Sequence, residues 1–369
     1  MSYRSRLFTK GDIYNIPDSD KLFIGAVNEN LRFHMKHCPE FDKILQMHGF
    51  ETDSLETVND LYKIPVLPTM FLKEHSLFSV PENKRTISGT TSGTSGKPTE
   101  VSMDRNTTAL AFFMVMRMFS YHKLFSPSPT NYVILGYEPS VRNKTGIAQA
   151  AYGMTLAAPA LNRAYALKDT GRDYELDMDG VIRSLMEYEK KGSPVRLVGL
   201  PAYFLFLMEA MEKAGIRLEL NPNSKVILHG GWKKFWRESA DKRTLYNMSE
   251  KNIGITEKRF HDIYGPVEHP ITYCDCKNHN FHVPIYSRII IRDVKTMAPL
   301  GYGKPGLVNL ITPLMGSMPY TSIMTDDLAV MHPGKECGCG IKAPWFELLG
   351  RAGANVRTCA ADAGELLKG

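Results

Sequence analysis

The chain has 369 residues, of which 43% are apolar and 23% are charged, and its net charge is +6. This composition is that of a globular protein of one large domain or two domains, and it excludes low-complexity and solenoid chains. The lysines and arginines are scattered, so the charge suits an anionic substrate and argues against nucleic-acid binding.

The first 85 or so residues are predicted to be helical. Asp18 or Asp20 can cap a segment whose apolar residues have helical spacing. These residues are Leu22, Phe23, Val27, Leu31 and Phe33. A loop rich in glycine, serine and threonine follows at Ser88–Thr99.

After this loop, predicted strands alternate with predicted helices. The strands are Glu100–Met103, Tyr132–Gly136, Arg196–Gly199 and Lys225–Leu228, and the helices run from Asn106 through Phe119, over Leu176–Lys190 and from Ala202 to about Ala214. Such alternation indicates an α/β fold with a largely parallel sheet. From about Phe281 the pattern changes to strands with few helices, at His282–Arg292, Gly306–Thr312 and Leu328–Met331, which predicts a β-rich second part.

The glycine-rich loop has the residues of a phosphate-binding loop. Its central residues are Thr91, Ser92, Gly93, Thr94, Ser95, Gly96 and Lys97. The glycines let the backbone approach a phosphate closely, the hydroxyl and backbone N–H groups form an anion cradle, and the lysine adds a positive charge. Thr91 and Pro98 depart from the Walker pattern, which needs glycine and a hydroxyl residue at these two positions.

This loop resembles that of the adenylate-forming superfamily, and further motifs of that superfamily follow in the expected order. The resemblance implies that the backbone of Gly230 and Gly231 lines an adenine, that Tyr264 stacks near it, and that Glu268 holds Mg²⁺. In Thr325-Asp326-Asp327-Leu328, Asp327 would bind the ribose hydroxyls. The resemblance implies that Arg351, in the hinge motif Gly350-Arg351, contacts ribose or phosphate.

Within the superfamily, the chain most resembles the LuxE-like acyl-protein synthetases, with phenylacetate–CoA ligases as neighbours. The supporting segments are His229–Lys233, Phe281–Pro284 and Val356–Cys359. The resemblance implies an α/β adenylate-forming large domain with layered parallel sheets and a β-rich subdomain, lacking the full C-terminal domain. Residues 1–85 would form a helical region of this domain, 86–350 its core, and 351–369 a short tail.

Four of the six cysteines and one histidine suggest a metal site. Cys274 and Cys276 form one Cys-x-Cys pair, and Cys337 and Cys339 form the other. Thiolate and imidazole are preferred ligands of Zn²⁺. In the resembling families, the spacing fits Cys276, His282, Cys337 and Cys339 as the four ligands of a closed structural site. Such a site would hold together the part from about 270 to 345. Cys274 or His279 could replace one of these ligands.

Cys359, in the C-terminal tail, gives a reason to expect acyl transfer. A thiolate is a strong nucleophile, and Arg357 can lower its pKa. The resemblance implies that ATP and Mg²⁺ activate a carboxylic acid, most plausibly a fatty acid, as acyl-AMP, and that Cys359 accepts the acyl group. An acyl-CoA reductase-like protein or an acyltransferase would be the next acceptor. The alternative is an acyl- or aryl-CoA ligase of the phenylacetate–CoA ligase type.

Two further expectations concern location and substrate. Met1–Lys10 is polar and no apolar segment is long enough to span a bilayer, so we expect a cytoplasmic protein without a membrane span. Apolar residues in Ala111–Phe119 and Tyr203–Met208 suggest an acyl pocket, although such stripes more often belong to a core.

Overall fold

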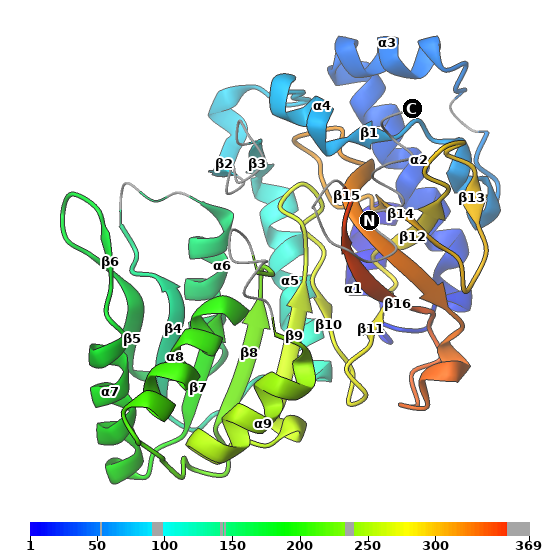
Figure 1. Ribbon diagram of the computed structural model, residues 1–369. Helices are drawn as coiled ribbons and strands as arrows, with labels where there is room; N and C mark the ends of the chain where they lie inside the picture. Colours follow the sequence, from blue (N-terminus) through cyan, green and yellow to red (C-terminus); the bar gives the residue numbers. More distant parts are fainter. Residues whose placement is uncertain (52–53, 91–98, 141–142, 144, 233–239, 353–369) are drawn as a thin grey trace. The chain divides into compact units, whose positions relative to one another are not determined.

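The computed structural model describes residues 1–51, 54–90, 99–140, 143, 145–232 and 240–352. The described residues form two compact units (Figure 1). The first contains residues 1–90, 99–118 and 265–352, and the second contains residues 119–264. Each unit is described separately below.

The N-terminal part of the first unit is helical, as the sequence predicts. Its α-helices are α1 (Tyr3–Thr9), α2 (Asp20–His37), α3 (Pro39–Met47) and α4 (Thr69–Glu74). Two details of the prediction for α2 are wrong. The N-cap residue is Ser19 rather than Asp18 or Asp20. Phe33 is exposed, whereas Phe23, Val27 and Leu31 are buried as expected.

The β-rich part of the first unit is one mixed sheet. Its strands have the order β11-β16-β15-β14-β12-β13, and β1 (Leu67–Pro68) pairs in parallel with β15. The bounds are β11 (Phe281–His282), β12 (Arg288–Arg292), β13 (Pro299–Leu300), β14 (Pro305–Ile311), β15 (Ser322–His332) and β16 (Trp345–Arg351), and a short β10 (Tyr273–Cys274) precedes them.

The predicted strand His282–Arg292 is broken in the middle. Its two ends form β11 and β12, and the segment between them leaves the ladder. There the Val283 amide donates to the Pro344 carbonyl, and the Ile285 amide donates to the carbonyl of Ile13 near the N-terminus. These distant backbone partners satisfy the segment, so it does not need to continue as a strand.

A two-stranded antiparallel ribbon flanks the glycine-rich loop. Strand β2 (Arg85–Thr90) leads to the loop and β3 (Glu100–Asp104) leads away from it. Helix α5 (Arg105–Tyr121) follows directly. Its first turn is capped by Asp104, whose Oδ1 accepts a hydrogen bond of 2.8 Å from the Thr107 amide, so the predicted cap Asn106 lies inside the helix.

The loop between β14 and β15 is buried throughout and is held by polar groups. The Met315 carbonyl accepts hydrogen bonds from Asn30 Nδ2 at 2.7 Å and from His34 Nε2 at 3.0 Å, both on α2. The Thr321 hydroxyl donates to Asn30 Oδ1 at 2.7 Å. Asn30 and His34 therefore lie on the buried face of α2 because the loop requires their side chains there.

The same loop is tied to the ribbon that flanks the glycine-rich segment. The Gly316 amide donates to Thr107 Oγ1 at 2.9 Å, and the Ser317 hydroxyl donates to the Ser102 carbonyl of β3. The Ser317 carbonyl accepts a hydrogen bond of 2.8 Å from the Ser79 amide. The buried loop thus connects α2, β3 and the start of α5.

The second unit is a sheet with helices packed on it. Its strands have the order β9-β8-β7-β4-β5-β6, parallel except for β6. The bounds are β4 (Thr130–Tyr137), β5 (Ala160–Asp169), β6 (Tyr174–Leu176), β7 (Val195–Gly199), β8 (Lys225–His229) and β9 (Phe260–Tyr264). The predicted parallel α/β arrangement is confirmed.

Helices of this unit cover its apolar core. They are α7 (Met178–Lys191), α8 (Pro201–Lys213) and α9 (Lys242–Ile253), and Figure 1 shows α8 and α9 in front of the strands. A further helix, α6 (Gly146–Met154), follows β4 in the chain. Val133, Leu197 and Val226 of the strands pack with residues of α7, α8 and α9. At the end of β7, Gly199 has φ +144°, and a Cβ there would lie 2.4 Å from the Leu135 carbonyl oxygen, so only glycine fits.

We expect the stability of the first unit to fall in mild acid because of His34. Burial lowers the pKa of His34 to about 3, while in the unfolded chain its pKa is about 6.5. The unfolded chain therefore takes up a proton that the folded one does not, and stability is complete above about pH 6.5 and is lost as the pH falls toward 3. From about pH 6.5 to about pH 4.5 the loss is about 2 kcal/mol.

Urea unfolding at several pH values of the wild type and of His34→Gln would measure this effect. Gln cannot titrate and can still donate to the Met315 carbonyl. The free energy of unfolding of the variant should therefore fall less steeply over this pH range. Parallel pH profiles for the two proteins would contradict the assignment.

Candidate functional site

Glu268 is a buried carboxylate in the turn that follows β9. Its side chain is only 7% exposed. Burial raises the pKa of Glu268, while a hydrogen bond with Thr99 and the positive charges of Arg351 and Lys73 act in the opposite direction. The structure thus brings the motif glutamate near Arg351 and near the residue that ends the glycine-rich segment. A carboxylate in such a setting is stabilised as an anion by an approaching cation.

Asp327 and Arg351 form an ion pair at the end of a β-hairpin. They are cross-strand partners on β15 and β16, and Arg351 Nε lies 3.3 Å from Asp327 Oδ1. The Asp327 amide also donates to Thr325 Oγ1 at 3.2 Å, in the stretch of β15 where the pairing with β14 shifts register. Asp326 differs from Asp327, since its Oδ1 accepts a hydrogen bond of 3.5 Å from Thr69 of α4.

The remaining described motif residues belong to the second unit. Gly230 and Gly231 follow β8 with φ values of +78° and +65°, a conformation that favours glycine. A Cβ on Gly231 would meet nothing within 4 Å, so this backbone has open space beside it. Tyr264 is the last residue of β9, in the strand next to β8.

Two groups of predicted site residues lie outside the described part of the chain. One is the glycine-rich segment with Thr91, Ser92, Gly93, Thr94, Ser95, Gly96 and Lys97. The other is Cys359. Their roles stay predictions.

The four predicted metal ligands lie together in the first unit. The ligand atoms of Cys276, His282, Cys337 and Cys339 are all within 4.8 Å of one another. The Sγ atoms of Cys276 and Cys337 are 3.5 Å apart, and Cys339 Sγ is 3.2 Å from His282 Nε2. Cys276 lies between β10 and β11, His282 is on β11, and Cys337 and Cys339 lie in the turn between β15 and β16, so distant parts of the chain come together.

The groups around the cluster fit a bound metal ion. The His282 Nδ1–H donates to the Ala343 carbonyl at 2.7 Å, which leaves Nε2 free of a proton and directed at the cysteines. Backbone amides of Asn278 and Ile341 donate to Cys276 Sγ and Cys339 Sγ at 3.4 and 3.3 Å. Such N–H···S contacts stabilise thiolates, the form of cysteine that binds metal.

Neither alternative ligand belongs to this cluster. Cys274 is buried, and burial raises the pKa of its thiol. His279 Nδ1 lies 2.7 Å from Asp275 Oδ2 and is held there. Among the described residues, the group that could hold a metal ion therefore contains Cys276 and His282 and not these two.

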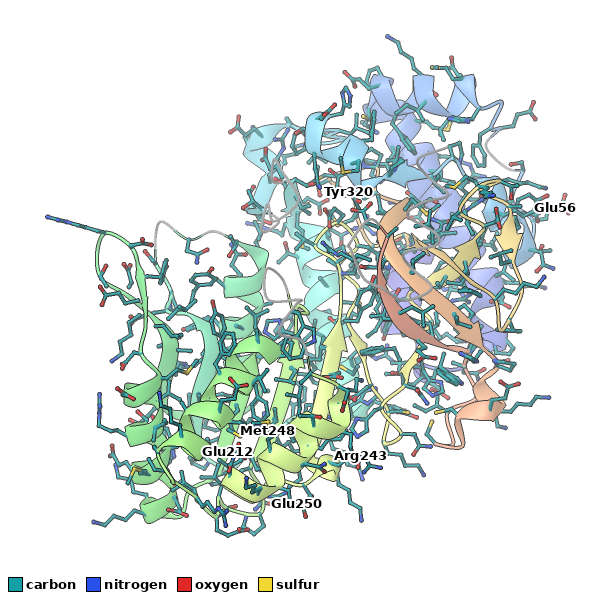
Figure 2. The ribbon with its side chains drawn as sticks, in the orientation of Figure 1. Glu56, Glu212, Arg243, Met248, Glu250 and Tyr320 are labelled. Atoms are coloured by element: carbon teal, nitrogen blue, oxygen red, sulfur yellow. The ribbon has the colours of Figure 1, made fainter. Side chains whose placement is uncertain are left out.

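The structure also shows residues that the sequence did not single out. Thr99 and Lys73 act on Glu268, and Tyr320 is fully buried. Burial raises the pKa of Tyr320, and so do the charges of Glu268 and Glu100. Figure 2 labels Tyr320. Thr99 could have been suspected from its place in the glycine-rich segment, whereas nothing local distinguishes Lys73 or Tyr320.

The two apolar stripes considered for an acyl pocket have different surroundings. Tyr203 and Met208 of α8 belong to the core of the second unit. On α5, Met114 and Met118 are buried, whereas Phe112 is 59% exposed. The stripe on α8 is therefore core rather than pocket.

Comparison with known proteins identifies the family. A family model described as "Acyl-protein synthetase, LuxE" matches residues 13–367. The chain belongs to the LuxE family. Like the members of this family, it is a ligase. The sequence-based resemblance to LuxE-like proteins is confirmed.

Two curated relatives are similar to this LuxE chain over most of its length. The long-chain-fatty-acid–luciferin-component ligase of Vibrio harveyi is 25% identical over 323 residues, covering 86% of this chain and 82% of the relative. The ligase of the same name from Aliivibrio fischeri is 22% identical over 331 residues, and the match covers 89% of this chain and 84% of the relative.

A solved structure shows the same fold. 2-Hydroxyisobutyryl-CoA ligase, in an open conformation with 2-HIB-AMP and CoA, superposes with a TM-score of 0.69 at 16% identity. The match covers 93% of this LuxE chain and 72% of the other. The expected adenylate-forming α/β fold is therefore confirmed. Within the described residues, no helix is long and apolar enough to span a membrane.

We expect Gly265→Ala to destabilise the turn that carries Glu268. A Cβ on Gly265 would lie 2.9 Å from the Ile271 carbonyl oxygen, and this backbone atom cannot move aside freely. The cost should be about 1–3 kcal/mol in the free energy of urea unfolding. Gly301→Ala is a matched control, because a Cβ there meets nothing within 4 Å. Equal stability of the two variants would contradict this account of Gly265.

Proposed function

We propose that this chain activates a fatty acid with ATP and transfers the acyl group to its own Cys359. In the first step, the substrate carboxylate attacks the α-phosphorus of ATP, giving acyl-AMP and pyrophosphate. In the second, the Cys359 thiolate attacks the acyl carbonyl, and AMP leaves with the bonding electron pair. The product is an acyl-thioester on the protein.

The observation that carries this proposal is the setting of Glu268 in a chain that belongs to the LuxE family. Its buried carboxylate, with a raised pKa, suits a hard cation with oxygen ligands such as Mg²⁺, which would bind as a complex with ATP. The ion pair of Asp327 with Arg351 lies on the same unit and offers a carboxylate for ribose hydroxyls and a guanidinium for phosphate.

The other motif residues take the roles implied by the resemblance. Lys97 and the amides of residues 91–96 would stabilise the charge that develops on the phosphates. The left-handed backbone at Gly230 and Gly231 would lie against the adenine, with Tyr264 stacked near it. The names of the two relatives, which specify a long-chain fatty acid, support an aliphatic acid as substrate. An acyl-CoA reductase-like or acyltransferase protein would then accept the acyl group from Cys359.

Self-acylation predicts a covalent adduct that depends on Cys359. Intact mass would be measured after incubation with ATP, Mg²⁺ and a panel of fatty and aromatic acids. The wild type should gain the mass of one acyl group, labile to hydroxylamine, because thioesters react with this nucleophile. Cys359→Ser should still release pyrophosphate and gain no labile mass.

Cys38→Ser is the control, since this buried cysteine lies outside the metal cluster and should leave the adduct intact. Pyrophosphate release without an adduct on the wild type would show that the acceptor is external. Turnover with added CoA by Cys359→Ser would then favour the CoA-ligase alternative. Absence of pyrophosphate with every acid would contradict the proposal as a whole.

We further propose that the cysteine–histidine cluster holds one structural Zn²⁺. Three thiolates and one imidazole complete a tetrahedral shell and leave no open position for catalysis. The ion would join β11 to the turn between β15 and β16.

Elemental analysis should find one zinc per chain in the wild type. Cys339→Ser and His282→Gln should each lower the zinc content and reduce the midpoint of thermal unfolding by at least ~5 °C. Cys274→Ser and His279→Gln should keep the zinc, because neither residue belongs to the cluster. Loss of zinc in those two variants, or full zinc in the first two, would refute the ligand set.

A further inference from the structure

Basic side chains form a row across the sheet of the second unit, near the starts of its parallel strands. Tyr132 of β4 is in register with Arg163 of β5 on one side and Arg196 of β7 on the other. Arg196 is in turn in register with Lys225, the first residue of β8. Residues in register on neighbouring strands point to the same face of the sheet.

This row lies on the face turned away from α7, α8 and α9. Val133, Leu197 and Val226 each follow a member of the row by one residue, and all three belong to the core under those helices. Because side chains alternate along a strand, the row faces the other side. Lys123, just after α5, adjoins this face, since its carbonyl accepts a hydrogen bond of 3.2 Å from Lys225 Nζ.

Arg196 carries a buried charge, and none of the described carboxylates contributes to its pKa shift. Its side chain is 2% exposed, and its Nη1 has no hydrogen-bond partner among the residues that the structure describes. Burial lowers the pKa of Arg196, and the electrostatic influence of Tyr132 acts in the opposite direction. A buried guanidinium is normally paired with an anion, because removing it from water is costly.

The neighbouring charges that act on Lys225 are also positive. Burial lowers the pKa of Lys225, and the positive charges of Arg196 and Lys123 lower it further. Within the part of the chain that the structure describes, no acidic side chain contributes to the pKa shift of Lys225 or of Arg196. Arg163, by contrast, is already engaged, because its Nε donates to Thr155 Oγ1 at 3.1 Å. Two cations with free donor capacity therefore converge at one place.

We propose that Arg196 and Lys225 form a binding site for a small oxyanion of the phosphate class. The planar guanidinium can donate two parallel hydrogen bonds to such an anion, and the ammonium adds a mobile point charge. Tyr132 lies beside Arg196 as its cross-strand neighbour. Exposure increases from buried Arg196 through half-buried Lys225 to exposed Lys123, so the anion enters from the Lys123 side.

This site is separate from the residues assigned to the nucleotide. Lys225 begins β8, whereas Gly230 and Gly231 follow its last residue, His229. A strand of five residues spans about 13–17 Å, so the two ends of β8 serve different ligands. The proposal does not depend on the ligase reaction.

Thermal unfolding in inorganic phosphate, with chloride replaced at constant ionic strength, tests the site. A ligand that binds only the folded state raises the unfolding midpoint in a saturable way. The wild type should show this rise. Lys225→Gln should bind phosphate about tenfold more weakly or worse. Arg196→Met should lose the response and be at least as stable as the wild type without phosphate, because it removes an unpaired buried charge.

Arg243→Gln is the matched control, because it removes one positive charge from α9 of the same unit (Figure 2). It should keep the wild-type response. A response that persists in both Arg196→Met and Lys225→Gln would place the anion elsewhere and overturn the proposal, as would a wild type without a saturable response. If Arg196→Met does not fold, the proposal is decided by comparing the phosphate response of Lys225→Gln with that of Arg243→Gln. Glycerol 3-phosphate in place of phosphate shows whether the site also takes a phosphate ester.

Discussion

The buried loop between β14 and β15 is the constraint on which the first unit depends. Asn30 and His34 of α2 hold its Met315 carbonyl, while Ser102 of β3 accepts from its Ser317. A buried backbone without regular structure needs such partners, since each unsatisfied group would cost about 1–3 kcal/mol. The N-terminal helices, the ribbon around the glycine-rich segment and the strand that carries Asp327 therefore share one set of hydrogen bonds. A change in any one of them alters the support of the others.

This dependence explains which parts of the fold the sequence could predict. Apolar patterns located strands β4, β7 and β8 of the second unit and helices α7 and α8 to within about two residues, because local periodicity reports burial directly, whereas β5, β6 and β9 were not predicted. The polar side chains of Asn30 and His34 interrupt the apolar face of α2, and only the distant carbonyl of Met315 explains them. The break between β11 and β12 likewise depends on partners at Ile13 and Pro344, which no local pattern reveals.

The site was predicted unevenly for a similar reason. Motif spacing identified Glu268, Asp327 and Arg351, and the structure brings the last two into an ion pair. The contributions of Thr99 and Lys73 to the pKa of Glu268 depend on three-dimensional proximity and leave no trace in spacing. The four predicted metal ligands could be singled out because cysteine is rare and its chemistry is narrow, and the structure brings them together, whereas the row through Arg196 is visible only once strand register is known.

The hairpin of β15 and β16 has the ion pair of Asp327 and Arg351 at one end and two of the proposed metal ligands in its turn. The ion pair and the turn are linked by six cross-strand pairs, which run from Asp327 opposite Arg351 to His332 opposite Trp345. Because a slip of one residue would turn every side chain of a strand to the opposite face, the length of the turn between Pro333 and Pro344 sets where Arg351 points. An insertion or deletion in that turn would thus disturb two distant chemistries at once, and natural variation in its length should be tightly restricted.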